Sequence, residues 1–145
     1  MKILSAIDLT RASAYVIEVV ERVAAATDAE VYVLHVVVPL PNIASPDLAP
    51  HLDNRNLGER YLDEQDQLAE LVKQLMDADI NATAVFRQGD PVKTIINEAR
   101  ELEVDLIVMG SHGHGPLFDA LIGSVSAGVL RQAGMPILVV PIPAT

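Results

Sequence analysis

Residues 105–126 read DLIVMGSHGHGPLFDALIGSVS, and this stretch decides how the rest of the chain is interpreted. A short, mostly apolar run at 105–109 leads into a glycine-rich segment, and a second glycine, Gly123, precedes a stretch that runs toward Gln132. A continuous apolar run is typical of a strand buried on both faces, as in a parallel sheet. The stretch therefore predicts a strand, a loop and a helix, in that order.

The rest of the chain repeats this alternation. Further apolar runs that predict strands buried on both faces are residues 2–7, 31–38, 82–87 and 137–140. Apolar residues at helical spacing lie between the runs: Ile17, Val20 and Ala24; Leu57, Tyr61, Leu68, Leu71 and Leu75; and Val92, Ile95, Ile96 and Ala99. Alternating strands and helices predict an α/β fold, a doubly wound five-stranded parallel sheet with helices on both faces.

Length and composition narrow the class of protein. With 145 residues, the chain is expected to form one domain, residues 1–145. Twenty acidic residues against ten basic ones give a formal charge of -10. Such a surface repels phosphate backbones and anionic headgroups, so neither nucleic acid nor membrane is an expected partner. The chain has no cysteine, which excludes disulfides, thiolate metal sites and a cysteine nucleophile.

The apolar runs also predict a location. Each is interrupted by Pro, His or Asp well before the ~18 residues that span a bilayer. The first run ends at Asp8, which is too early for the apolar region of a signal peptide. We therefore expect a cytoplasmic protein.

Turn residues agree with these boundaries. Gly89, Asp90 and Pro91 offer a turn, an N-cap and a proline at the first helical position. Gly134, followed by Pro136, is expected to end the fourth helix. Residues 39–56 contain four prolines and are interpreted as a surface loop or mobile flap. The acidic residues that follow are interpreted as a solvated outer face of the second helix: Glu59, Asp63, Glu64, Asp66, Glu70 and Asp77.

Candidate binding residues follow the strands, because ligands of open parallel sheets bind at the carboxyl ends of the strands. Residues 110–116, after the fourth strand, can present backbone N–H groups as an anion-binding nest. Gly123 and the two serines after it begin a helix, and a helix N-terminus suits a phosphate. A Walker A loop is excluded because no lysine lies between Glu101 and Leu130. A dinucleotide fingerprint is excluded because Phe118 stands where its last glycine would be.

A spaced glycine pattern directly follows the strand predicted at 105–109. It consists of Gly110 and Gly113, then nine intervening residues, then Gly123 and Ser124. This pattern resembles the ATP-binding branch of the universal stress protein family. The resemblance covers essentially the whole chain and includes residues 34–37, 89–91 and 136–141. It implies a Rossmann-like fold and a cytoplasmic stress-response protein that binds ATP together with Mg²⁺ or Mn²⁺.

The resemblance also implies roles for particular residues. Asp8 would lie at the ribose, and Val36 would line the adenine slot. The residues that would flank the ribose and the phosphates are Met109, Gly110 and Gly113. The residues that would hold the phosphate chain, with a divalent cation between the phosphates, are Gly123, Ser124, Val125 and Ser126.

Two features depart from the family pattern. Residues 116–122 contain Asp119 and no base, although relatives often carry Lys or Arg there. Phosphate charge would then be met by backbone amides, by His112 or His114, and by the metal, so binding should depend more on magnesium. Leu9 replaces the small or aromatic residue that usually follows the first acid.

Each candidate also has a plainer interpretation. Asp8 can serve only as a charge at a helix start, and the glycine-rich loop can be a simple connection. His112 and His114 lack a third ligand at metal-binding spacing and are interpreted as polar loop residues. His35 is expected to be a hydrogen-bonded core histidine. No pair of residues is placed for acid–base or nucleophilic catalysis.

Assembly and alternative functions follow from the last strand and from the loop. With the strand order 3-2-1-4-5, residues 137–140 form an exposed edge. Relatives dimerise through this segment, so we expect a homodimer through Ile137, Leu138, Val139 and Val140. The leading interpretation is a nucleotide-responsive regulator. The alternatives are a nucleotide-independent scaffold that acts through protein partners, and a slow ATPase or autokinase.

Overall fold

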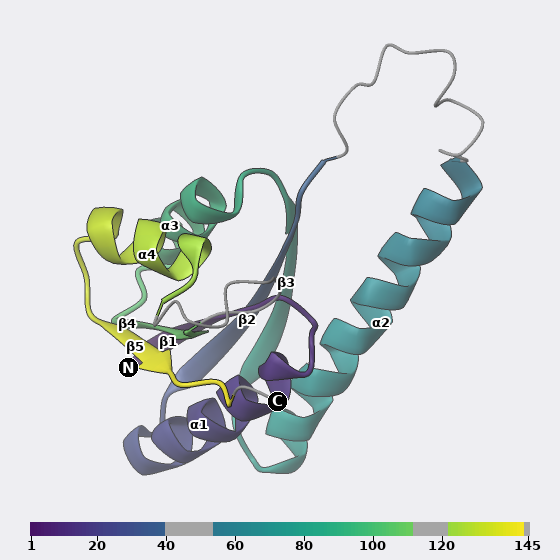
Figure 1. The fold of residues 1–145 in the computed structure, drawn as a ribbon. Helices are drawn as coiled ribbons and strands as arrows, with labels where there is room; N and C mark the ends of the chain where they lie inside the picture. Colours follow the sequence, from purple (N-terminus) through teal and green to yellow (C-terminus); the bar gives the residue numbers. More distant parts are fainter. Residues whose placement is uncertain (40–53, 112–121, 144–145) are drawn as a thin grey trace.

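The computed structural model describes residues 1–39, 54–111 and 122–143, which form a five-stranded, all-parallel sheet with helices on both faces (Figure 1). The strands are β1 (Lys2–Ile7), β2 (Glu30–Val37), β3 (Ala82–Gln88), β4 (Leu106–Gly110) and β5 (Ile137–Val140). The helices are α1 (Ala12–Thr27), α2 (Asn54–Asp77), α3 (Pro91–Glu101) and α4 (Ser124–Gln132). The strand order is β3-β2-β1-β4-β5, which confirms the predicted fold class.

The helices divide between the two faces of the sheet. On one face α1 and α2 pack on the sheet, and fully buried residues such as Ile17, Leu68 and Leu75 form the core. On the other face α3 and α4 cover residues that include Leu4 and Ile107. Successive strand residues point to opposite faces, so β1 supplies both cores at once. This arrangement explains why Ile3, Leu4, Ala6 and Ile7 are all apolar, although they point alternately to the two faces.

Local signals place the helix ends where the sequence predicted them. Asp90 is the N-cap of α3, and its carboxylate accepts from the backbone N–H of Lys93 at 3.0 Å. Pro91 occupies the first helical position. After α4 the chain reaches Gly134 in a left-handed conformation, with φ of 66°, which a residue with a Cβ rarely adopts. Asp90 therefore marks the start of α3, and Gly134 lies just beyond the end of α4.

Two expectations need correction. Residues 54–56, assigned to the proline-rich loop, already belong to α2. The rest of that predicted loop, except Pro39, lies outside the described residues. The runs at 82–87 and 137–140 are not buried on both faces, because β3 and β5 are edge strands. Thr83, Ala84 and Arg87 are exposed, and Ile137, Leu138 and Val139 are only partly buried. An edge strand has one neighbour instead of two, and its backbone and side chains keep more contact with water.

Candidate functional site

A cavity opens at the carboxyl ends of the central strands, where the strand order reverses between β1 and β4. Its volume is about 540 Å³, within the usual range for small-molecule sites. The apolar part of its lining comes from both faces of the sheet and includes Ala6, Ile7, Ala12, Val16, Leu34, Val36, Val37, Val38, Ile95, Met109 and Val125. Its polar side chains are Asp8, Ser13, His35, Arg60, Glu64, Ser124 and Ser126. The apolar side chains form most of the wall, and polar groups lie at two places, on the α2 side and at the start of α4.

The structure brings together most of the residues singled out from the sequence. The predicted residues that line the cavity are Asp8, Val36, Met109, Gly110, Gly123, Ser124, Val125 and Ser126. They come from the carboxyl ends of β1, β2 and β4 and from the start of α4. Gly113 lies outside the described residues, as do His112, His114 and Asp119. The roles of these residues toward a ligand stay predictions.

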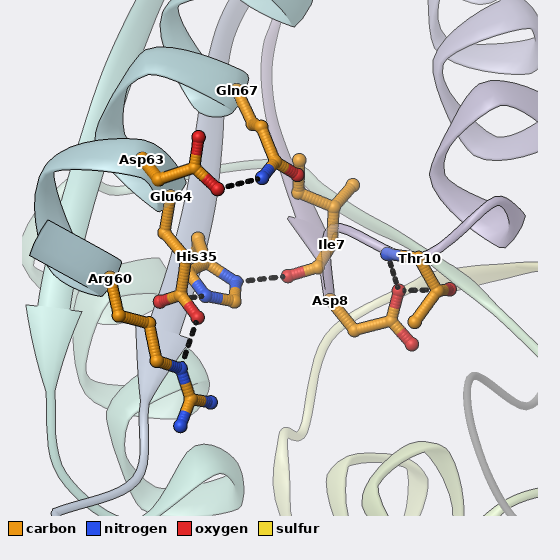
Figure 2. Close-up of polar contacts among 8 residues, drawn as sticks. All are labelled: Ile7, Asp8, Thr10, His35, Arg60, Asp63, Glu64 and Gln67. Carbon is orange, nitrogen blue, oxygen red and sulfur yellow. Dashed lines mark hydrogen bonds and ion pairs between the residues drawn. The ribbon is translucent and has the colours of Figure 1, made fainter. Parts of the chain in front are cut away.

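Asp8 shapes the turn between β1 and α1. Its Oδ1 accepts from the backbone N–H of Thr10 at 3.0 Å and from the Thr10 hydroxyl at 2.6 Å. The Thr10 hydroxyl oxygen in turn accepts from the backbone N–H of Ala12 at 3.2 Å. Leu9, between Asp8 and Thr10, has a φ of 60°. Figure 2 shows the Asp8 carboxylate beside Thr10. Asp8 therefore has a structural role whether or not it also contacts a ligand.

Gly110 lies where the end of β4 is packed most closely. A Cβ at this position would lie 3.3 Å from Cγ1 of Ile142 and 3.4 Å from Cγ2 of Val16, so little space is left for a side chain. The next residue, Ser111, donates its N–H to the Val140 carbonyl at 2.8 Å, and its hydroxyl oxygen accepts from the Ile142 N–H at 3.1 Å. The chain that follows β5 therefore holds the end of β4 in place.

The start of α4 presents the backbone donors of the cavity. Gly123 is the N-cap residue, and its φ of -70° and ψ of 167° are accessible to any residue. The N–H groups of Ser124, Val125 and Ser126 belong to the first turn, where helix donors have no acceptor within the helix. The Ser126 hydroxyl, however, donates to the Gly110 carbonyl at 2.7 Å. This hydrogen bond joins α4 to β4 and uses the hydroxyl proton of Ser126. The donor that Ser126 can offer a ligand is therefore its backbone N–H.

His35, Glu64 and Arg60 form a row of polar contacts on the α2 side of the cavity (Figure 2). Nδ1 of His35 lies 3.0 Å from the Ile7 carbonyl and Nε2 lies 3.4 Å from Oε2 of Glu64. The other Glu64 oxygen accepts from Nε of Arg60 at 3.1 Å. His35 is buried and hydrogen-bonded, which confirms the expectation for it, but it also lines the cavity.

The placement of Glu64 on a solvated outer face was wrong. Its side chain is 16% exposed and faces β2, whereas Glu59, Asp63, Asp66 and Glu70 are exposed. The sequence contains a signal that could have found it. Glu64 lies three residues after Tyr61 and four before Leu68, so it occupies the apolar stripe of the helix. An acid in that stripe needs a polar partner from the sheet, and His35 is that partner.

Within residues 1–39, 54–111 and 122–143, no cluster of three or more His, Asp or Glu side chains could hold a metal ion. The same residues include no helix with the length and apolar character needed to cross a bilayer.

Comparison with known proteins identifies the family. The family model of the universal stress protein family matches residues 1–141, so the chain belongs to this family. Universal stress protein YxiE of Bacillus subtilis is 29% identical over 144 residues, which covers 96% of this chain and 97% of that protein. Universal stress protein MJ0577 of Methanocaldococcus jannaschii is 33% identical over 76 residues, but the match spans only 52% of this chain and 47% of that protein.

Solved structures show the same architecture. The structure of MJ0577 superposes with a TM-score of 0.82 at 25% identity and covers 99% of this chain and 97% of that one. The universal stress protein from Archaeoglobus fulgidus, solved in complex with dAMP, has a TM-score of 0.68 at 18% identity and covers 97% of both chains. At that identity the second likeness shows the fold alone.

Proposed function

We propose that this protein binds ATP at the carboxyl-end cavity and acts as a nucleotide-responsive regulator in the stress response. The observation that carries the proposal is the composition of one continuous cavity, which extends from the apolar end of β2 to the first turn of α4. Valine and isoleucine walls suit a purine base, and the free donors of a helix start suit phosphate oxygens. A nucleotide has these two chemistries at its two ends.

The ligand's orientation follows from where these groups lie. The phosphates would bind at the N–H groups of Ser124, Val125 and Ser126, and the Ser124 hydroxyl is close to the same helix start. The base would then extend toward Val36 at the end of β2, and the ribose would lie near Asp8 at the end of β1. Met109 and Gly110 would line the part between them.

The charge of the cavity favours a nucleotide that carries its own cation. Asp8 and Glu64 are acidic, and Arg60 lies on the α2 side, away from the start of α4. Magnesium prefers oxygen ligands, and phosphate oxygens provide most of them in nucleotide sites. We therefore expect Mg²⁺, or Mn²⁺, to bind chiefly to the phosphates of ATP. The cation would neutralise the phosphate charge, because Ser124, Val125 and Ser126 at the start of α4 carry no positive side chain.

The family supports the nucleotide class of this proposal. A structural neighbour from Archaeoglobus fulgidus was solved with dAMP, an adenine nucleotide. The proposal places binding before catalysis, since no base–nucleophile pair was recognised in the sequence. It also takes residues 1–145 as one cytoplasmic domain. A nucleotide-independent scaffold and a slow ATPase or autokinase are the alternatives that the experiment below separates.

We also propose that the protein forms a homodimer through β5. This strand has one neighbour, β4, and Ile137, Leu138 and Val139 are only partly buried. An apolar edge strand with unpaired backbone groups is a ready surface for pairing with a second copy.

The test is nucleotide content and affinity in the wild type and in Gly123→Val. Gly123 lines the cavity and has a backbone conformation that valine can adopt, so the substitution adds a branched side chain at the helix start without requiring a left-handed backbone. We expect near-stoichiometric ATP or ADP in acid extracts of freshly purified wild type. Calorimetric titration should show magnesium-dependent ATP binding that Gly123→Val weakens by at least about 100-fold, with an unchanged circular dichroism spectrum.

Two results would change the proposal. If the wild type carries no nucleotide and millimolar ATP causes neither heat nor a shift in melting temperature, ATP is not the ligand and the scaffold interpretation leads. If wild type releases phosphate from ATP well above the rate of Gly123→Val, the protein is a slow ATPase in addition to a binder.

A further inference from the structure

Arg60 is held at the mouth of the cavity by contacts that begin in the sheet. The Ile7 carbonyl can only accept, so Nδ1 of His35 carries the hydrogen that joins them. The ring orientation set by this bond directs Nε2 toward Oε2 of Glu64, 3.4 Å away, and this contact is a hydrogen bond when Nε2 also carries a hydrogen, as in an imidazolium. Glu64 then binds Nε of Arg60 through its other oxygen, four residues away on the same helix. A side chain that is 63% exposed is thus given a defined position by a partly buried carboxylate.

Among the described residues that line the cavity, Arg60 is the one with a permanent positive charge. Arg60 was not a candidate from the sequence. The family pattern places a base between residues 116 and 122, where this chain has none, and Arg60 lies on a different element. Its place on α2 decides which part of a ligand it can reach.

Arg60 lies at the end of the site opposite α4. It lines the cavity from α2 together with Val36, Val37 and Val38 at the end of β2, and α2 contacts β2 and β3. The helix start at α4 follows β4, and β1 separates β2 from β4. Neighbouring strands lie about 4.8 Å apart, so the ends of β2 and β4 are separated by roughly 10 Å. A nucleotide with its phosphates at α4 therefore presents its base to Arg60.

The chemistry of Arg60 suits a base better than a phosphate. Glu64 accepts a hydrogen bond from Arg60, and the two opposite charges largely cancel at distances beyond the pair. The attraction of Arg60 for a phosphate is therefore reduced. The flat guanidinium group can still stack on an aromatic ring, an interaction that lysine makes less well. We propose that Arg60 packs against the face of the adenine base, with Glu64 and His35 as the positioning residues that hold it. This inference rests on the proposed function and names a residue that determines its specificity.

The experiment compares ligands with and without phosphates. Adenosine and ATP are titrated calorimetrically into wild type, Arg60→Met and Arg60→Lys. Methionine keeps an unbranched helical side chain without the flat cation, and lysine keeps the charge without the plane. Lys73→Met is the matched control, because Lys73 pairs with Asp77 at the same spacing on α2 and does not line the cavity.

We expect Arg60→Met to weaken adenosine and ATP binding by the same factor, about 5-fold, and Arg60→Lys to weaken both by about 3-fold. Lys73→Met should match the wild type. The inference is overturned if Arg60→Met has no effect, or if its effect is confined to ATP and Arg60→Lys restores binding, since Arg60 would then contact phosphates. If wild type binds neither ligand, the proposed function fails together with this inference.

Discussion

The two ends of the parallel sheet are built differently. At the amino end, backbone hydrogen bonds join neighbouring segments: Glu30 donates to the Met1 carbonyl at 3.0 Å, and Asp105 donates to the Lys2 carbonyl at 2.8 Å. The backbone N–H of Lys2 in turn donates to the Asp105 carboxylate, also at 2.8 Å. At the carboxyl end, α1, which follows β1, and α4, which follows β4 in the order of elements, pack on opposite faces of the sheet, and residues at the starts of both helices line the cavity.

The contrast between the two ends indicates that this fold separates stability from binding. The amino end satisfies its polar groups within the protein, so substitutions there should change the free energy of unfolding. The carboxyl end keeps helix-start donors and a polar row that surround a cavity, so substitutions there should change ligand affinity. Gly123→Val tests the binding half of this comparison, and the following variants test the rest.

The largest expected effect on stability is that of Leu75→Ala. Leu75 is fully buried near the end of α2, and its carbonyl accepts from the N–H groups of Ala78 and Ile80 in the turn toward β3. Removing its side chain should lower the free energy of unfolding by about 3 kcal/mol, measured by urea denaturation. ATP affinity at a temperature where the variant is folded should match the wild type. A parallel loss of affinity would contradict the separation of the two ends.

An intermediate effect is expected at Asp8, which belongs to the carboxyl end but also supports the fold. Asp8→Ala removes the acceptor of two Thr10 hydrogen bonds and should lower the free energy of unfolding by about 1 kcal/mol. Asp8→Asn keeps an oxygen that can accept them, so its melting temperature should be near that of the wild type.

Calorimetry on the same two variants separates the roles of Asp8. If Asp8 contacts the ribose, both variants should bind ATP more weakly, by about 10-fold for Asp8→Ala. If Asp8→Ala is less stable but neither variant changes ATP affinity, the role of Asp8 is limited to stabilising the turn between β1 and α1.

The smallest expected effect is at Tyr32, near the amino end. Its hydroxyl donates to Oε1 of Glu30 at 2.7 Å. This hydrogen bond, followed by burial and by the Glu30 charge, raises the pKa of Tyr32 above its ordinary value. A raised pKa means that the folded protein holds the proton more tightly than the unfolded chain. The contribution to stability is therefore complete below the unfolded pKa of about 10 and is lost as pH rises through the folded pKa.

Denaturation of wild type and Tyr32→Phe across this range measures the effect. The wild type should be slightly more stable than Tyr32→Phe near neutral pH, and the difference should decrease above about pH 10. ATP affinity near neutral pH should be equal in the two proteins. A difference in stability that grows with rising pH would mean that Tyr32 is stabilised in its charged form instead.

Much of the fold could be predicted because its signals are local. Continuous apolar runs, helical spacing, and caps such as Asp90 and Gly134 each act within a few residues, and right-handed crossovers restrict how the strands can be arranged. The exposure of β3 could not be read in the same way. Its run of Ala84, Val85 and Phe86 is typical of a buried strand, whereas Thr83 and Arg87 are polar, and the edge position accounts for the exposure of Ala84 as well.

Local sequence patterns are enough to predict the strands, the helices and the glycine and serine positions that line the cavity. The packing of the elements, in contrast, brings Glu64 to His35, 29 residues away in the sequence, and the Ser126 hydroxyl to the Gly110 carbonyl. It also brought Arg60 to a cavity whose other walls come from β1, β2, β4 and α4. The physical reason is that periodicity reports which side of an element is buried, whereas the partner of a buried polar group depends on how elements pack.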